Sequence, residues 1–93
     1  MATLIKTDGS EAEIQPANGK SFTLEEMQKC VGGNIELAHT RDGRMMWINE
    51  EGKLNDLPPN EKATQLYVHN DHDIIVGDVL VGTEKEFADD DEE

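Results

Sequence analysis

The chain has 93 residues, of which 21 are Asp or Glu and 8 are Lys or Arg, so its formal net charge is -13. This excess of carboxylates repels phosphate backbones and anionic membranes, so we expect no direct binding to nucleic acid or to a membrane. It favours fast encounter with basic protein surfaces, although acidic residues also simply keep a small protein soluble.

The first predicted elements are two short strands, at residues 3–6 and 12–15, on either side of the pair Asp8-Gly9. Asp-Gly favours a tight turn because glycine adopts positive φ without steric cost. The two segments are expected to form a hairpin or to stand as two separate short strands. The next segment, PANGKS at residues 16–21, is expected to be a loop.

A helix over residues 24–31 has the clearest boundaries in the sequence. Thr23 is its predicted N-cap, and Glu26, three residues later, completes a capping box. Gly32 follows the last predicted turn and supplies the left-handed residue that commonly ends helices. The helix is therefore expected to have two turns.

A second hairpin is predicted after this helix. Residues 34–40 alternate between apolar and polar side chains, which indicates a half-buried strand. Asp42-Gly43 is a second tight turn, and residues 44–49 are expected to pair back as the next strand. Apolar residues on both faces of the second strand suggest a central position in the sheet.

The stretch NEEGKLNDLPPN, residues 49–60, separates this hairpin from a second predicted helix. Its adjacent prolines favour extended backbone before them, and Asn60 is the predicted N-cap of a helix that reaches about Val68. The most apolar run, residues 74–82, is predicted to be a strand interrupted at Gly77.

These elements follow one another in the order β-β-α-β-β-α-β. We predict one α+β domain, residues 1–83, in which a mostly antiparallel sheet of about five strands packs with two short helices. Residues 84–93 are expected to form an acidic, disordered tail.

We expect neither a signal for export nor a membrane anchor in this chain. Its first residues, MATLIKTDGS, lack the basic and apolar regions of a signal peptide, and no apolar run approaches about 20 residues. The single cysteine, Cys30, excludes an intrachain disulfide and is expected to be a small buried hydrophobe. A soluble, cytoplasmic protein is expected.

Three sequence blocks occur together and in order. They are VGGNIEL at residues 31–37, NEEGKLNDLPPN at 49–60 with Ala63-Thr64 after it, and DIIVGDVLV at 73–81. Together they resemble a family of small phage, plasmid and integrative-element proteins that is catalogued as a domain of unknown function. The resemblance covers residues 30–81 and implies an origin in bacterial mobile elements rather than a particular activity. The N-terminal hairpin and the acidic tail lie outside it.

No catalytic signature stands out, so we expect a protein that is not an enzyme and needs no cofactor. One cluster has the residue types that ligate zinc; it comprises His69, Asp71, His72 and Asp73. A closed structural zinc site needs four ligands, and only His39 remains elsewhere among the histidines. A polar loop at the end of a helix is therefore the favoured interpretation, with metal binding as the alternative.

The favoured function is inhibition of a host defence factor that handles nucleic acid, such as a CRISPR effector or a restriction enzyme. Spaced carboxylates on a rigid sheet imitate duplex phosphates, because both present regular negative charge to a groove of Arg and Lys. The partner would be a host protein with a basic surface, met in the bacterial cytoplasm. The predicted partner-binding residues are Glu50, Glu51, Asp71, Asp73, Glu84, Glu86, Asp89, Asp90, Asp91, Glu92 and Glu93.

The alternative function is a small-ligand binder that sequesters a signalling nucleotide, closed by oligomerisation such as a homodimer. Its predicted ligand-binding residues are Arg41, Arg44, Trp47 and Lys53. Trp47 with Met45 and Met46 would also suit an exposed hot spot, although a lone Trp beside Met is more often part of a core. A structural accessory protein of the virion or the replication machinery is a third hypothesis.

Overall fold

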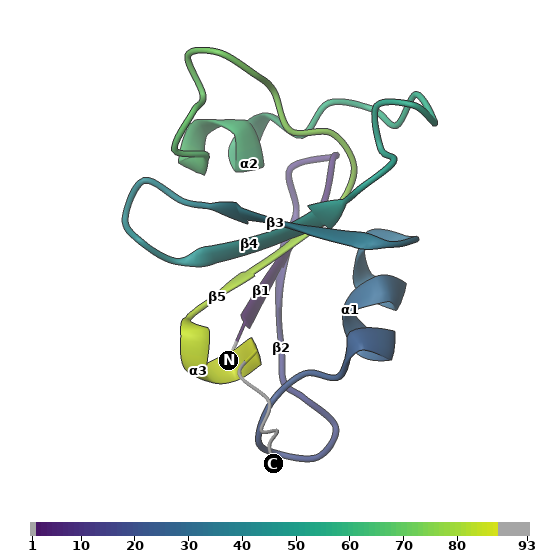
Figure 1. Cartoon of the computed structure of the whole chain (residues 1–93), viewed down its shortest axis with the longest axis vertical. Coiled ribbons are helices and arrows are strands. Elements are labelled where there is room, and N and C mark those ends of the chain that lie inside the picture. The colour runs from purple at the N-terminus through teal and green to yellow at the C-terminus, as the bar shows by residue number, and fades with distance from the viewer. Residues whose placement is uncertain (1, 88–93) are drawn as a thin grey trace.

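The computed structural model describes residues 2–87, which form a five-stranded antiparallel sheet with the order β2-β1-β5-β4-β3 (Figure 1). The strands are β1 (Ala2–Ile5), β2 (Glu11–Ile14), β3 (Ile35–His39), β4 (Met45–Asn49) and β5 (Val79–Gly82). The helices are α1 (Leu24–Val31), α2 (Glu61–Leu66) and α3 (Glu84–Phe87). The predicted α+β class and its antiparallel sheet are confirmed.

Strand β5 is central and joins the β1–β2 and β3–β4 hairpins. It pairs with β1 on one side and with β4 on the other, so Leu80 lies opposite both Leu4 and Trp47. All four residues of β5 are buried, which accounts for the continuous apolar sequence of this strand. Strands β2 and β3 are the two edges of the sheet.

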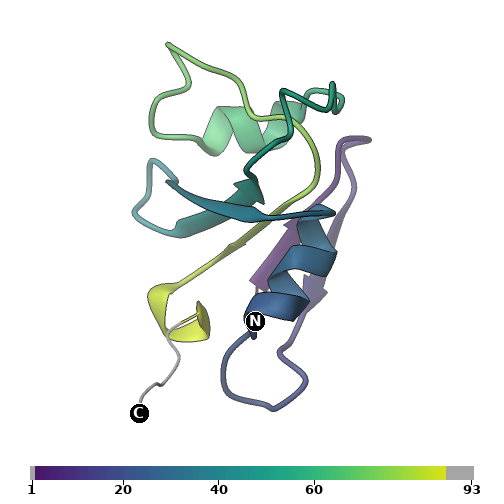
Figure 2. The same cartoon turned by 45° about the vertical axis from the view of Figure 1, so that its right-hand side comes forward.

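The sheet has helices on both faces, α2 on one and α1 with α3 on the other (Figures 1 and 2). Each face has its own buried cluster. The cluster on the α2 face contains Ile5, Ala38, Met46, Ala63, Ile75, Val79 and Val81. The cluster on the opposite face contains Ala2, Phe22, Met27, Leu80 and Phe87. The longest helix within residues 2–87 has 8 residues, and none of the described helices is long and apolar enough to cross a bilayer.

Helix α1 begins and ends at the predicted residues. The Thr23 hydroxyl accepts a hydrogen bond from the Glu26 N–H (3.2 Å), and the Glu26 carboxylate accepts one from the Thr23 N–H (2.8 Å). The same carboxylate accepts a bond from the Ala17 N–H (2.9 Å), so it also holds the preceding loop. These donors, Thr23 first and then Ala17, lower the pKa of Glu26. Gly32 has φ of +83° and ends the helix.

Asn60 is the N-cap of α2, as predicted, and it is also fully buried at 0% exposure. Its Oδ1 accepts a hydrogen bond from the Ala63 N–H (3.1 Å). Its Nδ2 donates to the carbonyl oxygens of Ile5 and Gly77, both at 2.9 Å. One side chain therefore connects α2 to β1 and to the segment that leads into β5.

Helix α2 ends at Leu66, about two residues before the predicted end at Val68. Tyr67 is extended, with ψ of 136°, and forms an isolated antiparallel bridge with Thr40. The Val68 N–H donates to the His39 carbonyl (3.0 Å). Backbone pairing with the end of β3 therefore ends the helix at Leu66.

Strand β5 begins at Val79, whereas the sequence predicted a strand from residue 74. Val76 makes only an isolated bridge, with Pro59. Gly77 has φ of +80°, and a Cβ there would lie 2.8 Å from the Leu57 side chain, so the position requires glycine. The predicted interruption at Gly77 is therefore the place where the chain turns into β5.

The packed domain continues past residue 83, where the sequence placed the start of a tail. Glu84–Phe87 form α3, and Phe87 is buried at 8% exposure. The Phe87 ring stacks on Phe22 (centroids 5.7 Å apart) and meets Trp47 edge-on (5.8 Å). The domain therefore includes residues 84–87. Asp89, Asp90, Asp91, Glu92 and Glu93 lie outside the described residues.

Candidate acidic binding surface

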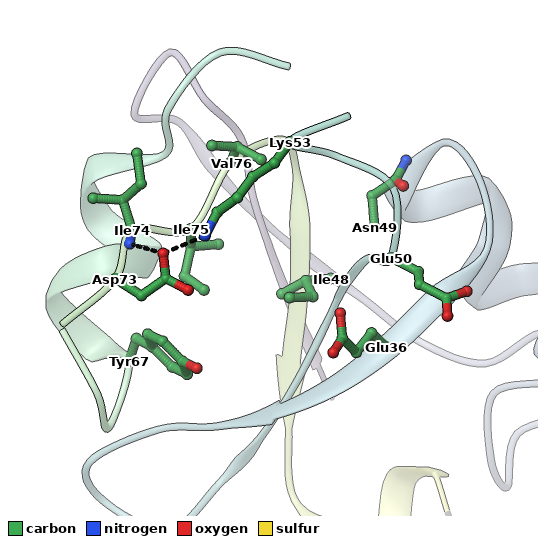
Figure 3. Close-up of a pocket in the computed structure, with 10 residues that line it drawn as sticks. All are labelled: Glu36, Ile48, Asn49, Glu50, Lys53, Tyr67, Asp73, Ile74, Ile75 and Val76. Carbon is green, nitrogen blue, oxygen red and sulfur yellow. Dashed lines mark hydrogen bonds and ion pairs between the residues drawn. The ribbon is translucent and has the colours of Figure 1, made fainter. Parts of the chain in front are cut away.

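A pocket of about 140 Å³ lies on the α2 face of the sheet, beside the edge strand β3 (Figure 3). Its lining comes from β3, from β4 and the turn after it, and from the segment between α2 and β5. The lining residues are Glu36, Ile48, Asn49, Glu50, Lys53, Tyr67, Asp73, Ile74, Ile75 and Val76.

The pairing of β3 with β4 places two of the carboxylates. Glu36 lies opposite Ile48 in the ladder, on the α2 face, because its neighbour Ala38 two residues on packs against α2. Glu50 directly follows β4, and its N–H donates to the Asn34 carbonyl (2.8 Å), which holds the turn beside β3. Glu36 and Glu50 thus lie at the same end of the pocket, as Figure 3 shows.

The opposite side of the pocket holds an ion pair between Lys53 and Asp73 (Figure 3). Asp73 also accepts a hydrogen bond from the Ile74 N–H (2.8 Å). The bond from Lys53 and then the bond from Ile74 lower the pKa of Asp73. Among the lining residues Lys53 is the one cation, against three carboxylates, and it is already paired. The pocket therefore keeps an excess of negative charge.

Replacing Lys53 by methionine is expected to raise the pKa of Asp73 toward its usual value of 3.8, because the main cause of the lowering is lost. Since the folded-state pKa is lowered, the stabilisation by ionised Asp73 is present above pH 3.8 and is lost as the pH falls through the folded value. A carboxyl carbon NMR titration measures the change. Lys62→Met, which removes the partner of Glu11 instead, is the control. An Asp73 pKa that is the same in Lys53→Met and in the unaltered protein would contradict the assignment.

The structure divides the predicted partner-binding carboxylates between two places. Glu50 and Asp73 line the pocket. Glu51 follows Glu50, with its N–H bonded to the Asn49 side chain (2.8 Å), and Asp71 lies in the loop of Asp73, 3.5 Å from His72. Glu84 and Glu86 belong to α3, which packs on the opposite face of the sheet (Figure 1). The described carboxylates therefore do not form one continuous face.

Glu36 was not among the predicted binding residues. The alternation of β3 indicates that its side chain points away from Ile35 and Leu37, but not what lies beside it. Lys53 and Asp73, which line the same pocket, are distant from Glu36 in sequence and come to the pocket only through the fold.

The structure does not bring together the four residues predicted for a nucleotide ligand. Lys53 pairs with Asp73 at the pocket, whereas Arg44 bonds its own turn through Asp42 (Nε to Oδ2, 3.0 Å). That Arg44 bond, followed by the bond from the Thr40 hydroxyl, lowers the pKa of Asp42 to about 2. Arg41 is exposed beside the same turn.

The fourth predicted ligand residue, Trp47, lies on the other face of the sheet, where it packs with the cluster around Phe87. Met46, next to it in β4, is 0% exposed and faces α2. These positions agree with the core interpretation of Trp47 and its methionine neighbours. A site for anionic phosphates would need converging cations, which the pocket does not provide.

Neither the histidine-rich loop nor the cysteine has the surroundings of a reactive site. In the part of the chain that the structure describes, no three His, Cys, Asp or Glu side chains gather in a metal-binding arrangement. In the loop, Asp73 is bonded to Lys53 and Asp71 lies beside His72. Burial, and then the Glu26 carboxylate, raise the pKa of the Cys30 thiol, so the thiol is protonated at neutral pH.

Comparison with known proteins identifies the family of the chain but not its activity. A family model described as "Domain of unknown function (DUF3846)" matches residues 1–93. No curated protein and no solved structure matches the chain. The match extends over the whole length, including the N-terminal hairpin, which the sequence blocks did not reach. The chain therefore belongs to the DUF3846 family, a family defined by a domain of unknown function.

Proposed function

We propose that the protein is a non-enzymatic accessory protein of a phage or another mobile element, acting in the bacterial cytoplasm. It binds a basic surface of a host protein that handles nucleic acid, and it thereby keeps nucleic acid away from that surface. Defence factors such as CRISPR effectors and restriction enzymes have basic grooves of this kind and are the proposed targets.

The observation that supports this proposal is the uncompensated negative charge beside β3. Glu36 and Glu50 are exposed and lack an ion-pair partner within residues 2–87. They lie together at one end of the pocket, held by the β3–β4 pairing. Carboxylates fixed by a sheet present charge at set spacings, which favours association with a cationic groove and discriminates against other partners.

The net charge of the protein also favours binding to a basic partner. A net charge of -13 on 93 residues creates a long-range negative potential that speeds encounter with basic surfaces. Three of the cations, Arg44, Lys53 and Lys62, are already paired with carboxylates. The 21 Asp and Glu residues exceed the 8 Lys and Arg residues by 13, so the carboxylates far outnumber the cations that could pair with them.

Capture from bacterial cytosol, with elution by a DNA duplex, tests the proposal. The immobilised protein should retain nucleic-acid-binding proteins at low salt, and the duplex should displace them because both compete for one groove. Glu36→Gln/Glu50→Gln should reduce retention. Glu13→Gln/Glu25→Gln removes the same charge from exposed residues of β2 and α1 and should retain the proteins. Retention that neither the duplex nor Glu36→Gln/Glu50→Gln reduces would contradict the proposal.

A further inference from the structure

We propose that the outer edge of β3 accepts an extended segment of the partner as a sixth strand of the sheet. The segment carries a Lys or Arg between two apolar residues. The inference rests on the proposed function, since it takes the partner to be basic, and it adds the mode of recognition: backbone pairing at a defined edge with one cationic side chain in the pocket.

The backbone of β3 has unused hydrogen-bonding groups on its outer side. The Glu50 N–H donates to the Asn34 carbonyl (2.8 Å) and the Thr40 N–H donates to the Arg44 carbonyl (2.9 Å). The even-numbered residues of β3 therefore direct their backbone N–H and C=O groups toward β4. The odd-numbered residues Ile35 and Leu37 therefore direct their N–H and C=O groups outward. An edge with unpaired groups of this kind is a template for another strand.

The C-terminal end of the same edge already demonstrates the pairing. The Val68 N–H donates to the outward carbonyl of His39 (3.0 Å), which agrees with the orientation deduced for the odd-numbered residues. Chain segments after α2 thus cover the edge at His39 and Thr40. No backbone bond of residues 2–87 beyond the β3–β4 ladder reaches Ile35 or Leu37. The open part of the edge is therefore short and suits a segment of a few residues.

The side chains along this edge define what the added strand should carry. Glu36 projects to the α2 face beside the pocket, whose lining includes the apolar side chains of Ile48, Tyr67 and Ile75 (Figure 3). A Lys or Arg opposite Glu36 would pack its aliphatic stem against this apolar part of the lining and bring its charge to the carboxylates. On the other face, Leu37 is 39% exposed and would contact apolar neighbours of that residue.

The other edge and a second copy of the chain suit the observations less well. On β2, Glu11 is already paired with Lys62, and the position between the two glutamates is the small Ala12. A second copy would bring another net charge of -13 to the edge, which opposes association. A basic partner segment is complementary in charge where a second copy is not.

Amide hydrogen exchange measured by NMR tests the proposal, with a short capped peptide of alternating valine and lysine as the probe. In the free protein the Ile35 and Leu37 amides should exchange fast, and the peptide should slow both by about tenfold or more because they become hydrogen-bonded. The same peptide with alternate backbone nitrogens methylated presents the same side chains but cannot pair, and it should give no protection.

Three variants complete the experiment, two on β3 and one on β2. Leu37→Pro removes an outward N–H, which an edge strand tolerates, and should abolish binding of the peptide. Glu13→Pro makes the same change on β2, where the N–H of residue 13 also points away from the sheet. In this variant the peptide should still slow the exchange of the Ile35 and Leu37 amides. Leu37→Lys keeps the backbone donor but repels the basic peptide, so it provides a second test if the proline variant does not fold.

The possible failures are distinguishable. Peptide binding that leaves the exchange of Ile35 and Leu37 unchanged, binding equal in Leu37→Lys and the unaltered protein, or no binding to the unaltered protein would each overturn strand addition. If Glu36→Gln/Glu50→Gln still reduces capture of cytosolic proteins in those cases, the acidic surface stands without the added strand. If it does not, the proposed function fails as well.

Discussion

Replacing Asn60 by alanine is expected to lower the free energy of unfolding by about 3 kcal/mol, a large share of the stability of a small domain. Three buried hydrogen bonds would be lost: those to the carbonyls of Ile5 and Gly77 and the one from the N–H of Ala63. A buried polar group left without a partner costs about 1–3 kcal/mol, and loss of a helix N-cap typically costs about 1 kcal/mol. Urea denaturation with an unchanged m-value measures the difference.

Two further variants sharpen this prediction. Asn60→Asp keeps the acceptor for Ala63 but cannot donate to the two carbonyls, so it should be at least as destabilising as alanine. Asn55→Ala changes an exposed residue of the same stretch and should alter stability by no more than about 0.5 kcal/mol. Equal effects of the Asn60→Ala and Asn55→Ala substitutions would show that Asn60 does not connect the elements as described.

Reversing the two carboxylates at the pocket is expected to weaken binding of the partner by about 100-fold, which corresponds to about 2.7 kcal/mol. Glu36→Lys/Glu50→Lys replaces two attractive charges by two repulsive ones at the proposed contact. The association rate should therefore fall and the dissociation rate should rise. The dissociation constant of the target recovered by DNA elution, measured at one low salt concentration, gives the effect.

The matched control places the same change in charge elsewhere. Glu13→Lys/Glu25→Lys also changes the net charge by four units, but on β2 and α1. Because long-range attraction falls with the net charge, a moderate loss of about threefold is expected from the control. If the two double variants weaken binding equally, the position of the carboxylates would have no role and only the net charge would matter.

The sequence predicts helix α1 at both ends because its signals are local. Thr23, Glu26 and Gly32 form the cap and the stop within a few residues of the helix itself. The two hairpins are also local, since their turns lie between neighbouring strands. Such contacts depend little on the rest of the fold.

The ends of α2 and β5 depend on distant contacts, and there the predictions differ from the structure. Tyr67 leaves the helix to pair with Thr40 of the second hairpin. Residues before β5 are held by Asn60 and by the Pro59–Val76 bridge rather than by the sheet. Helix α3 has only four residues, and its position follows from Phe87 docking on Phe22 and Trp47.

The candidate site was predictable only in part for the same reason. Glu50 and Asp73 were among the predicted partner-binding carboxylates, and the structure brings both to the pocket. The arrangement of Glu50 and Asp73 around one pocket with Glu36 and Lys53 depends on the β3–β4 pairing and on the path of the chain after α2. No local sequence pattern indicates either of these. The excess of acidic residues indicates a basic partner but does not indicate where it binds.

The salt dependence of binding tests the central claim most directly. The dissociation constant of the captured target is to be measured with the unaltered protein as monovalent salt rises from about 50 to about 200 mM. If carboxylates fill a cationic groove, the affinity should fall by about tenfold or more over this range, because surface charge pairs are screened by salt. An affinity that stays constant across the series would contradict recognition by an acidic surface.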